Sequence, residues 1–305
     1  MCKISLLNYN EDKKMENNIA NIPSEFFVPT NHEYPPHNKM IFEEYFFNYF
    51  TNLDIETEYV YLPIMWTNFY IGRNYGNDDM TDLQTYLNGL DRSKKYFTII
   101  QYDDGILQHV GDYPEHLELL IFGAGGGGRK HVPPINLGYP IPLLCQPDPS
   151  ANKNRDRDIL ASFVGTIDKS YTIRQKLRKM YEKTDSFVIR EHSGYKKFVD
   201  IMERSVFSLC PRGYGATSFR ICEALQHGSI PVYVFDSAWI PWPDEFDFNE
   251  IGIWVHELNI KEIGDILRSK TAEEIAKYRT NGARIYEEYF TFEGCARQII
   301  KKICQ

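Results

Sequence analysis

The sequence contains no long hydrophobic run. A signal peptide needs an apolar core of about 7–15 residues and a membrane-spanning helix needs about 20. The first residues, MCKISLLNYNEDKKMENNIANIP, do not supply such a core, and no later stretch is long enough to span a membrane. We therefore expect a soluble, cytoplasmic protein that carries no membrane anchor.

Cysteine and histidine are too few and too scattered for a structural site. No two cysteines form a CxxC pair, and no histidine stands at zinc-finger spacing from a cysteine. In a chain of 305 residues this scatter predicts free thiols in a reducing compartment rather than a disulfide framework, and it argues against a zinc site. The cysteines are Cys2, Cys145, Cys210, Cys222, Cys295 and Cys304.

The sequence also lacks an excess of basic charge. Its 34 Lys and Arg residues face 42 Asp and Glu residues, for a net charge of −8. Nucleic-acid-binding domains are commonly basic, so we predict no nucleic-acid partner. The content of 43% hydrophobic and 25% charged residues is that of a globular protein and excludes a disordered chain or a collagen. Most of the aromatic residues, 14% of the chain, are expected in the core.

The length predicts two domains, since one domain takes about 150 residues. A proline-rich stretch over residues 133–149 leads into the polar segment SANKNRDRD, which indicates a linker. We place an N-terminal domain at residues 1–150, beginning with a polar arm at 1–38, and a C-terminal domain at residues 151–305. As an alternative, the last helix crosses back and packs on the first domain.

Strands and helices alternate along both halves, which predicts an α/β fold with parallel sheets. Ligands of such sheets bind beyond the carboxyl ends of the strands. The expected strands are 59–64, 96–101, 117–122, 159–164, 186–190, 205–209 and 230–235, and the expected helices are 40–50, 79–90, 173–182, 195–204, 219–227, 260–267 and 271–300.

An arginine is predicted in the first turn of the helix at residues 173–182. Thr172 and Gln175 have the spacing of a capping box, which puts Arg174 beside the free N–H groups of the helix start. The helix dipole disfavours a cation there unless an anion bridges the two. The segment therefore indicates an anion site, and the alternative is a solvated surface arginine.

The segment 205–234 repeats this arrangement. A buried strand leads into a turn with two glycines, Thr217 or Ser218 caps the next helix, and Arg220 follows in the first turn. One turn further on, Glu223 has the chemistry to accept two hydroxyl hydrogen bonds, as from a ribose. The alternative for Glu223 is an ion pair with Arg220 at the i, i+3 spacing.

Three motifs of this segment resemble the exostosin family of glycosyltransferases, GT47. They are FSLCPRG at residues 207–213, SFRICEAL at 218–225 and HGSIPV at 227–232. The SFVG ahead of Arg174 is also similar to an F-x-G…R element of that family. The resemblance covers about residues 160–260. In the first half it is loose, and the IMWTN and QYDDG segments look more like short soluble members from large viruses and microbes.

The resemblance implies a GT-B architecture, in which two Rossmann-like domains face each other across a cleft. It implies an inverting transfer of a sugar from a UDP-sugar to the hydroxyl of a glycan or glycoprotein, without a metal or another cofactor. Carried over, Arg174, Arg220 and Ser218 hold the diphosphate, Glu223 holds the ribose and Tyr195 lies near the uracil. The full donor-side set is Gly165, Arg174, Tyr195, Pro211, Arg212, Gly213, Ser218, Arg220 and Glu223.

The donor sugar does not follow from the residues. Family analogy makes UDP-xylose the first donor to test. A GDP-sugar transferase of the fucosyl type and a non-catalytic nucleotide- or carbohydrate-binding protein remain as alternatives. The sequence does not indicate an oligomeric state.

A base must remove the acceptor proton, and QYDDG after the strand at 96–101 offers the best candidates, Asp104 or Asp103. The alternative is an Asp-Gly turn with two solvated carboxylates. Asp79 is instead expected to cap a helix. Weaker candidates for the base are Asp78, His109 and His131.

Three further motifs are set aside or left open. The glycine run at 123–128 is followed by prolines instead of a helix, so we predict a loop, either on the surface or with Arg129 or Lys130 near the acceptor. The DxD at Asp156–Asp158 precedes a strand and is expected to be solvated, not metal-binding. Two roles remain for the tryptophans near residues 237–255: they line a wall for the donor sugar or they pack in the core. These residues are Trp239, Trp242 and Trp254, and core packing is favoured for Trp254.

Overall fold

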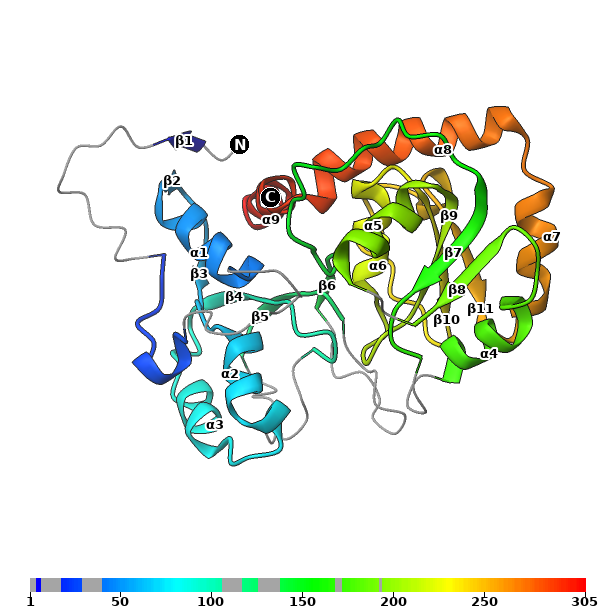
Figure 1. Ribbon diagram of the computed structural model, residues 1–305. Helices are drawn as coiled ribbons and strands as arrows, with labels where there is room; N and C mark the ends of the chain where they lie inside the picture. Colours follow the sequence, from blue (N-terminus) through cyan, green and yellow to red (C-terminus); the bar gives the residue numbers. More distant parts are fainter. Residues whose placement is uncertain are drawn as a thin grey trace. The chain divides into compact units, whose positions relative to one another are not determined.

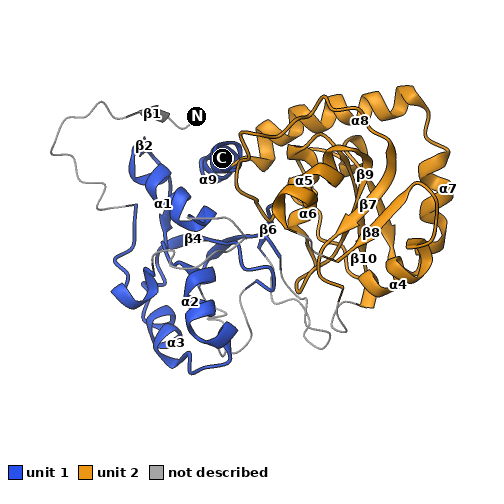
Figure 2. Cartoon of the chain, viewed as in Figure 1, with its two compact units in different colours: residues 1–141, 292–305 blue, residues 142–291 orange. Residues whose placement is uncertain are grey.

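The computed structural model describes residues 4–6, 18–28, 40–105, 117–125, 138–167, 172–191 and 194–305. The chain forms two compact units, residues 1–141 with 292–305 and residues 142–291 (Figure 2). The sequence places the domain boundary near residue 150, and the structure changes unit after Ile141. The C-terminal helix α9, Phe292–Ile303, is part of the first unit.

The first unit is built on a parallel sheet with strand order β3-β4-β5-β6. Helix α1 covers one face, where Phe46 and Phe50 contact Phe97 of β4. Helices α2 and α3 cover the other face (Figure 1). The strands are β3 Tyr59–Tyr61, β4 Lys95–Ile100, β5 Leu119–Gly123 and β6 Tyr139–Pro140, and the helices are α1 Phe42–Thr51, α2 Trp66–Gly72 and α3 Thr81–Asn88.

The expected N-terminal arm contributes to this unit where the structure describes it. Phe26 is buried in the core beside α2 and α3. Strand β1, Ile4–Leu6, pairs antiparallel with β2, Leu53–Ile55.

The second unit is a five-stranded parallel sheet with strand order β8-β7-β9-β10-β11. Alternate residues of its strands pack on α4 and α7 on one face, and α5 and α6 cover the other (Figure 1). The strands are β7 Ile159–Val164, β8 Phe187–Arg190, β9 Ser205–Pro211, β10 Ile230–Phe235 and β11 Ile253–His256, and the helices are α4 Thr172–Tyr181, α5 Tyr195–Glu203, α6 Phe219–Gln226 and α7 Ile263–Arg268.

The predicted α/β class is confirmed, with a parallel, Rossmann-like sheet in each unit. Among the described strands and α-helices, the short elements β1, β2, β6, β11 and α2 were not predicted. The helical segment expected at 271–300 is instead divided into α8, Ala272–Ile285, a π-helical turn at Tyr286–Phe290, and α9. In the part of the chain that the structure describes, no helix combines the length and the apolar character needed to cross a membrane.

Candidate functional site

The strand order of the second unit locates its ligand-binding edge. Counted along the chain within this unit, the order is 2-1-3-4-5, so the connections reverse direction between β7 and β9. Open parallel sheets bind their ligands at this switch point, beyond the carboxyl ends of the two strands. Gly165 directly follows β7, and Arg212 and Gly213 directly follow β9. All three residues lie in the donor-side set predicted from the sequence.

Arg174 and Arg220 come together at the end of β7. Arg174 donates from Nη1 to the carbonyl oxygen of Thr166 at 3.0 Å, and Arg220 donates from Nη2 to that of Val164 at 2.7 Å. Both guanidinium groups lie over the ring of Phe163, at 5.5 and 5.7 Å from its centroid. Phe163 was not among the predicted site residues, although it belongs to the SFVG motif. Thr172 was predicted as the residue before the helix, whereas it is the first residue of α4. Arg174 still lies in the first turn.

Arg220 is a mostly buried cation with unused donors. Its side chain is 15% exposed, and its guanidinium lies 4.3 Å from the ring centroid of Phe198. Among the residues that the structure describes, its buried Nε and Nη1 atoms have no hydrogen-bond acceptor. Glu223 lies 3.3 Å from Nη1, which is the ion pair the sequence offered as an alternative. Because a buried cation is costly unless hydrogen-bonded, these donors fit an anionic ligand.

The turn between β9 and α6 holds this arginine in place. Ser218 is the N-cap of α6, and its hydroxyl accepts from the backbone N–H of Arg220 at 3.3 Å. The N–H of Gly213 donates to the carbonyl oxygen of Thr217 at 2.9 Å, which closes the turn. A Cβ atom added to Gly165 would lie 3.3 Å from Nη2 of Arg220. A glycine at this position therefore leaves room for the Arg220 guanidinium beside the end of β7.

Arg212 is engaged within the protein. It donates from Nη1 to both carboxylate oxygens of Asp236, at 2.8 and 3.0 Å, while Pro211 closes β9 beside it. Burial raises the pKa of Asp236 and the hydrogen bonds from Arg212 lower it, with a net pKa below the usual carboxyl range. The sequence did not indicate Asp236. A donor-binding role for Arg212 stays a prediction, and the observed pair holds the ends of β9 and β10 together.

Tyr195 is similarly hydrogen-bonded to a residue that the sequence did not indicate, Asp148. Its hydroxyl donates to Oδ2 of Asp148 at 2.7 Å, and burial together with this carboxylate raises its pKa. His227 is buried at the C-cap of α6, where its Nδ1 lies 3.1 Å from Oε1 of Glu203. The Asp-Pro-Ser turn at Asp148 was the available sequence signal, because its carboxylate accepts from Ser150.

The predicted base lies in the first unit, in the segment after β4. Asp104 is 8% exposed and Asp103 is half-buried. Gly105, at φ +70°, donates from its N–H to the carbonyl of Tyr102 at 2.9 Å. The turn of the alternative is therefore present, but Asp104 is buried in it and not solvated. Asp79 accepts from the N–H of Thr81 at 2.9 Å, although Met80 occupies the cap position of α3. Arg129, Lys130, His109 and His131 lie outside the described residues.

The loop after β5 packs directly on Asp103. A Cβ atom added to Gly125 would lie 2.0 Å from the carbonyl oxygen of Asp103, a separation no real contact allows. We expect Gly125→Ala to displace the Asp103–Asp104 segment and to lower the free energy of unfolding by about 1–3 kcal/mol, the usual cost of overpacking. Urea titration checks this value. Gly72→Ala is the matched control, since open space surrounds that glycine, and equal losses in both variants would contradict the prediction.

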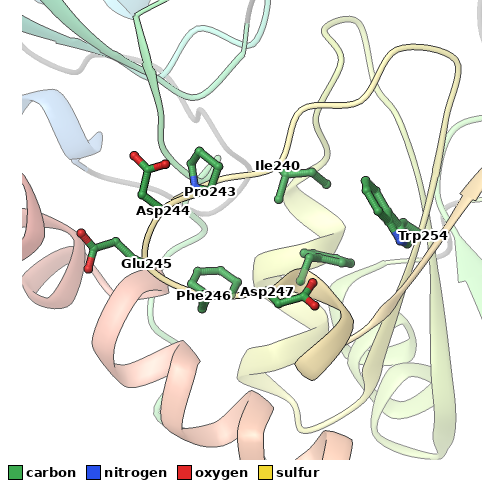
Figure 3. Close-up of a pocket in the computed structure, with 8 residues that line it drawn as sticks. Ile240, Pro243, Asp244, Glu245, Phe246, Asp247 and Trp254 are labelled. Atoms are coloured by element: carbon green, nitrogen blue, oxygen red, sulfur yellow. The ribbon is translucent and has the colours of Figure 1, made fainter.

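The tryptophans of the second unit reverse the expectation. Trp239 and Trp242 are buried, whereas Trp254, favoured as a core residue, is 45% exposed. Trp254 lines a hollow of about 510 Å³ beside edge strand β11, with Asp244 and Glu245 on the side away from it (Figure 3). The switch point lies between β7 and β9, so this hollow belongs to a different edge of the sheet.

The described residues contain no cluster of three or more His, Cys, Asp or Glu side chains arranged to hold a metal ion. Asp158 of the DxD forms an exposed ion pair with Arg204.

These features define the second unit as a Rossmann-like domain with a cationic site at its switch point. Residues 129–270 match the family model described as the Exostosin GT47 domain. The match confirms the resemblance predicted from the sequence for this part of the chain. The matched range includes all the predicted donor-side residues.

Two proteins of known name are similar in sequence to part of this chain. The chain is 37% identical over 102 residues to Exostosin-1 of Drosophila melanogaster, covering 33% of this chain and 13% of the relative. It is 36% identical over 80 residues to the probable beta-1,4-xylosyltransferase IRX10 of Arabidopsis thaliana, covering 26% and 19%. The chain thus spans less than a fifth of the length of either relative.

Two solved structures are similar to the chain at lower sequence identity. Anabaena HepE in complex with UDP-glucose has 11% identity and a TM-score of 0.45, covering 81% of this chain and 78% of that one. An alpha-glucosyltransferase in complex with UDP-glucose and DNA has 9% identity and a TM-score of 0.40, covering 87% and 85%.

Proposed function

We propose that this protein is an inverting glycosyltransferase that moves a sugar from a UDP-sugar to a hydroxyl of a glycan or glycoprotein. The observation that carries the proposal is the pair of arginines at the switch point of the second unit. There, Nε and Nη1 of the mostly buried Arg220 have no hydrogen-bond acceptor among the described residues. The match of residues 129–270 to the Exostosin GT47 domain model and the names of the relatives support the same activity.

In this proposal the second unit binds the donor. Arg174 and Arg220 face the diphosphate, and the N–H groups at the start of α6, capped by Ser218, add positive potential. As the bond from the anomeric carbon to the phosphate oxygen breaks, negative charge grows on the departing UDP. Two guanidinium groups held by carbonyl oxygens are already oriented to offset that charge. Glu223 holds the ribose, and Arg220 exchanges part of its ion pair with Glu223 for the diphosphate.

The first unit supplies the base. The acceptor oxygen forms its bond to the anomeric carbon from the face opposite the leaving UDP, which inverts the configuration. Its proton passes to a carboxylate, Asp104 or Asp103, so that the products are the glycoside, UDP and a protonated carboxyl group. The Asp103–Asp104 segment lies at the carboxyl end of β4, the edge at which parallel sheets place ligand loops.

A panel of nucleotide sugars tests the function. The protein is incubated with UDP-xylose, other UDP-sugars and GDP-fucose, with and without oligosaccharide acceptors, and free nucleotide is measured. Release of UDP that rises with acceptor supports the proposal. Release of GDP alone would assign a GDP-sugar transferase, and binding without release from any donor would assign a non-catalytic binding protein.

We expect full activity in excess EDTA. The arginines and the start of α6 occupy the role that a divalent metal plays in other sugar transferases. UDP release is compared before and after dialysis against EDTA, with a metal-dependent glycosyltransferase treated in parallel as the control. A loss of activity that added Mg²⁺ or Mn²⁺ restores would remove metal independence from the proposal.

A further inference from the structure

Glu43 is a fully buried carboxyl group in the first unit that the proposed mechanism does not use. It lies in the first turn of α1, and its side chain is 0% exposed. Glutamate is almost never fully buried unless its oxygens are satisfied, because burial of a charge is costly. Its partners therefore indicate what holds it there.

Its two oxygens accept hydrogen bonds from three donors, and the Thr67 backbone N–H is shared between both oxygens. Oε1 accepts from the Thr67 hydroxyl at 2.8 Å and from the Gln101 backbone N–H at 2.8 Å. Oε2 accepts from the Thr67 backbone N–H at 3.1 Å. Thr67 is in the first turn of α2, and Gln101 is the first residue after β4. One carboxyl group thus joins α1, the start of α2 and the end of β4.

Gln101 opens the segment that carries the candidate base. Residues 101–105 run from β4 to Gly105 and contain Asp103 and Asp104, and we call them the acceptor loop. A second set of contacts ties α2 to the same strand and loop. Trp66 donates from Nε1 to Oγ1 of Thr98 at 2.8 Å, and the rings of Tyr70 and Tyr102 are 5.2 Å apart. Glu43 supplies the only carboxyl group among these named contacts.

We propose that Glu43 is a positioning residue for transfer, because its carboxyl group joins Thr67 to Gln101 and so sets the direction in which the acceptor loop presents Asp103 and Asp104. This inference rests on the proposed function for the identity of the base. Glu43 cannot be the base itself, since none of its surface reaches solvent.

The protonation of Glu43 gives the role a measurable signature. Burial raises its pKa from 4.5 to about 7, against the lowering effect of the hydrogen bonds from Gln101 and Thr67. An ionised carboxylate accepts all three bonds, whereas a protonated one gives up an acceptor position. Tyr61 of β3 is the titratable neighbour among the described residues, and burial together with Glu43 raises its pKa well above 10, so it stays neutral near pH 7.

The test compares Glu43→Gln with Glu44→Gln, a change of the same chemistry at the next position of α1. Glutamine keeps the shape of Glu43 but turns an N–H group toward one of the three donors. We expect Glu43→Gln to lower kcat by about 10-fold to 100-fold, as a misplaced reacting group does. The KM for the UDP-sugar and the affinity for UDP should stay unchanged, because donor binding belongs to the second unit. Glu44→Gln should behave as the wild type.

The pH profile separates positioning from a purely structural role. In the wild type, log kcat should rise as Glu43 ionises near pH 7, and Glu43→Gln should lack that limb. The folded pKa lies above the unfolded value, so the folded state binds more protons between pH 4.5 and 7, and wild-type stability should fall with rising pH in that window. Thr67→Val removes one of the three donors and should reproduce part of the kcat loss.

Amide hydrogen exchange tests the proposal without any sugar donor. Exchange over residues 96–105 should be faster in Glu43→Gln than in Glu44→Gln. Wild-type kcat, KM and pH profile in a folded Glu43→Gln variant would overturn the positioning role. So would an unchanged exchange rate over this segment. If the wild type releases no nucleotide from any donor, the proposed function fails, while the exchange comparison still decides whether Glu43 holds the loop.

Discussion

Arg220→Ala should lower sugar transfer by at least about 100-fold, the cost of losing one donor that faces developing charge. The affinity for UDP should fall as well, because the diphosphate would lose the buried guanidinium between Val164 and Phe198. Alanine also frees the carbonyl oxygen of Val164 and the carboxylate of Glu223. Initial rates of UDP release and calorimetric titration with UDP measure the two effects.

Two further variants make the result specific to the site. Arg220→Lys keeps the charge but loses the forked geometry that binds a phosphate through two N–H groups, so we expect an intermediate loss. Arg204→Ala removes an exposed arginine of the same unit that pairs with Asp158, and it should leave transfer unchanged. Normal transfer by a folded Arg220→Ala protein would contradict the assignment of the donor site to the switch point.

Asp104→Asn should have the second large effect, a fall in kcat of about 10²–10⁴-fold, the usual contribution of a general base. The amide keeps the size of the carboxyl group and cannot take the acceptor proton. Asp104 is the first choice because it is the more buried of the two neighbouring carboxylates. Single-turnover rates with saturating donor measure this loss directly.

Asp103→Asn and Asp91→Asn serve as the comparisons. Asp103 shares the acceptor loop, so a larger loss there than at Asp104 would reassign the base to Asp103. Asp91 lies in an exposed turn, where it accepts from Ser93, and its variant should keep wild-type kcat. UDP affinity should be the same in all three variants. Near-normal kcat at both loop positions would place the base elsewhere in the protein.

Most strands and helices of both units were predictable because their signals are local. The apolar segments at residues 96–101 and 230–235 were expected as strands and form β4 and β10. The missed elements are short. Strand β11 has four residues, and α2 has seven with a buried first turn, so neither shows a full hydrophobic period. The π-helical turn at residues 286–290 interrupts a segment whose composition stays helical throughout.

The candidate site divides in the same way. Ser218, Arg220 and Glu223 lie within one helix start, so their spacing predicted that they share a site, including the ion pair between Arg220 and Glu223. The partners that orient other side chains are remote in sequence. Asp236 lies 24 positions from Arg212, and Asp148 lies 47 positions from Tyr195. No local pattern marks such pairs.

Composition, strand-helix alternation and the motifs between residues 160 and 260 were enough to identify the α/β class, the exostosin resemblance and the two cationic helix starts. These properties depend on spacing along a strand or a helix, which the order of residues defines. The common ring under Arg174 and Arg220, the tie from Glu43 to Gln101 and the packing of Gly125 on Asp103 needed the folded chain. Each of these contacts joins segments that are remote in sequence and that come close only when the sheets form. Buried polar groups must be hydrogen-bonded, and the partner that each one meets depends on the folded packing and not on its distance along the chain.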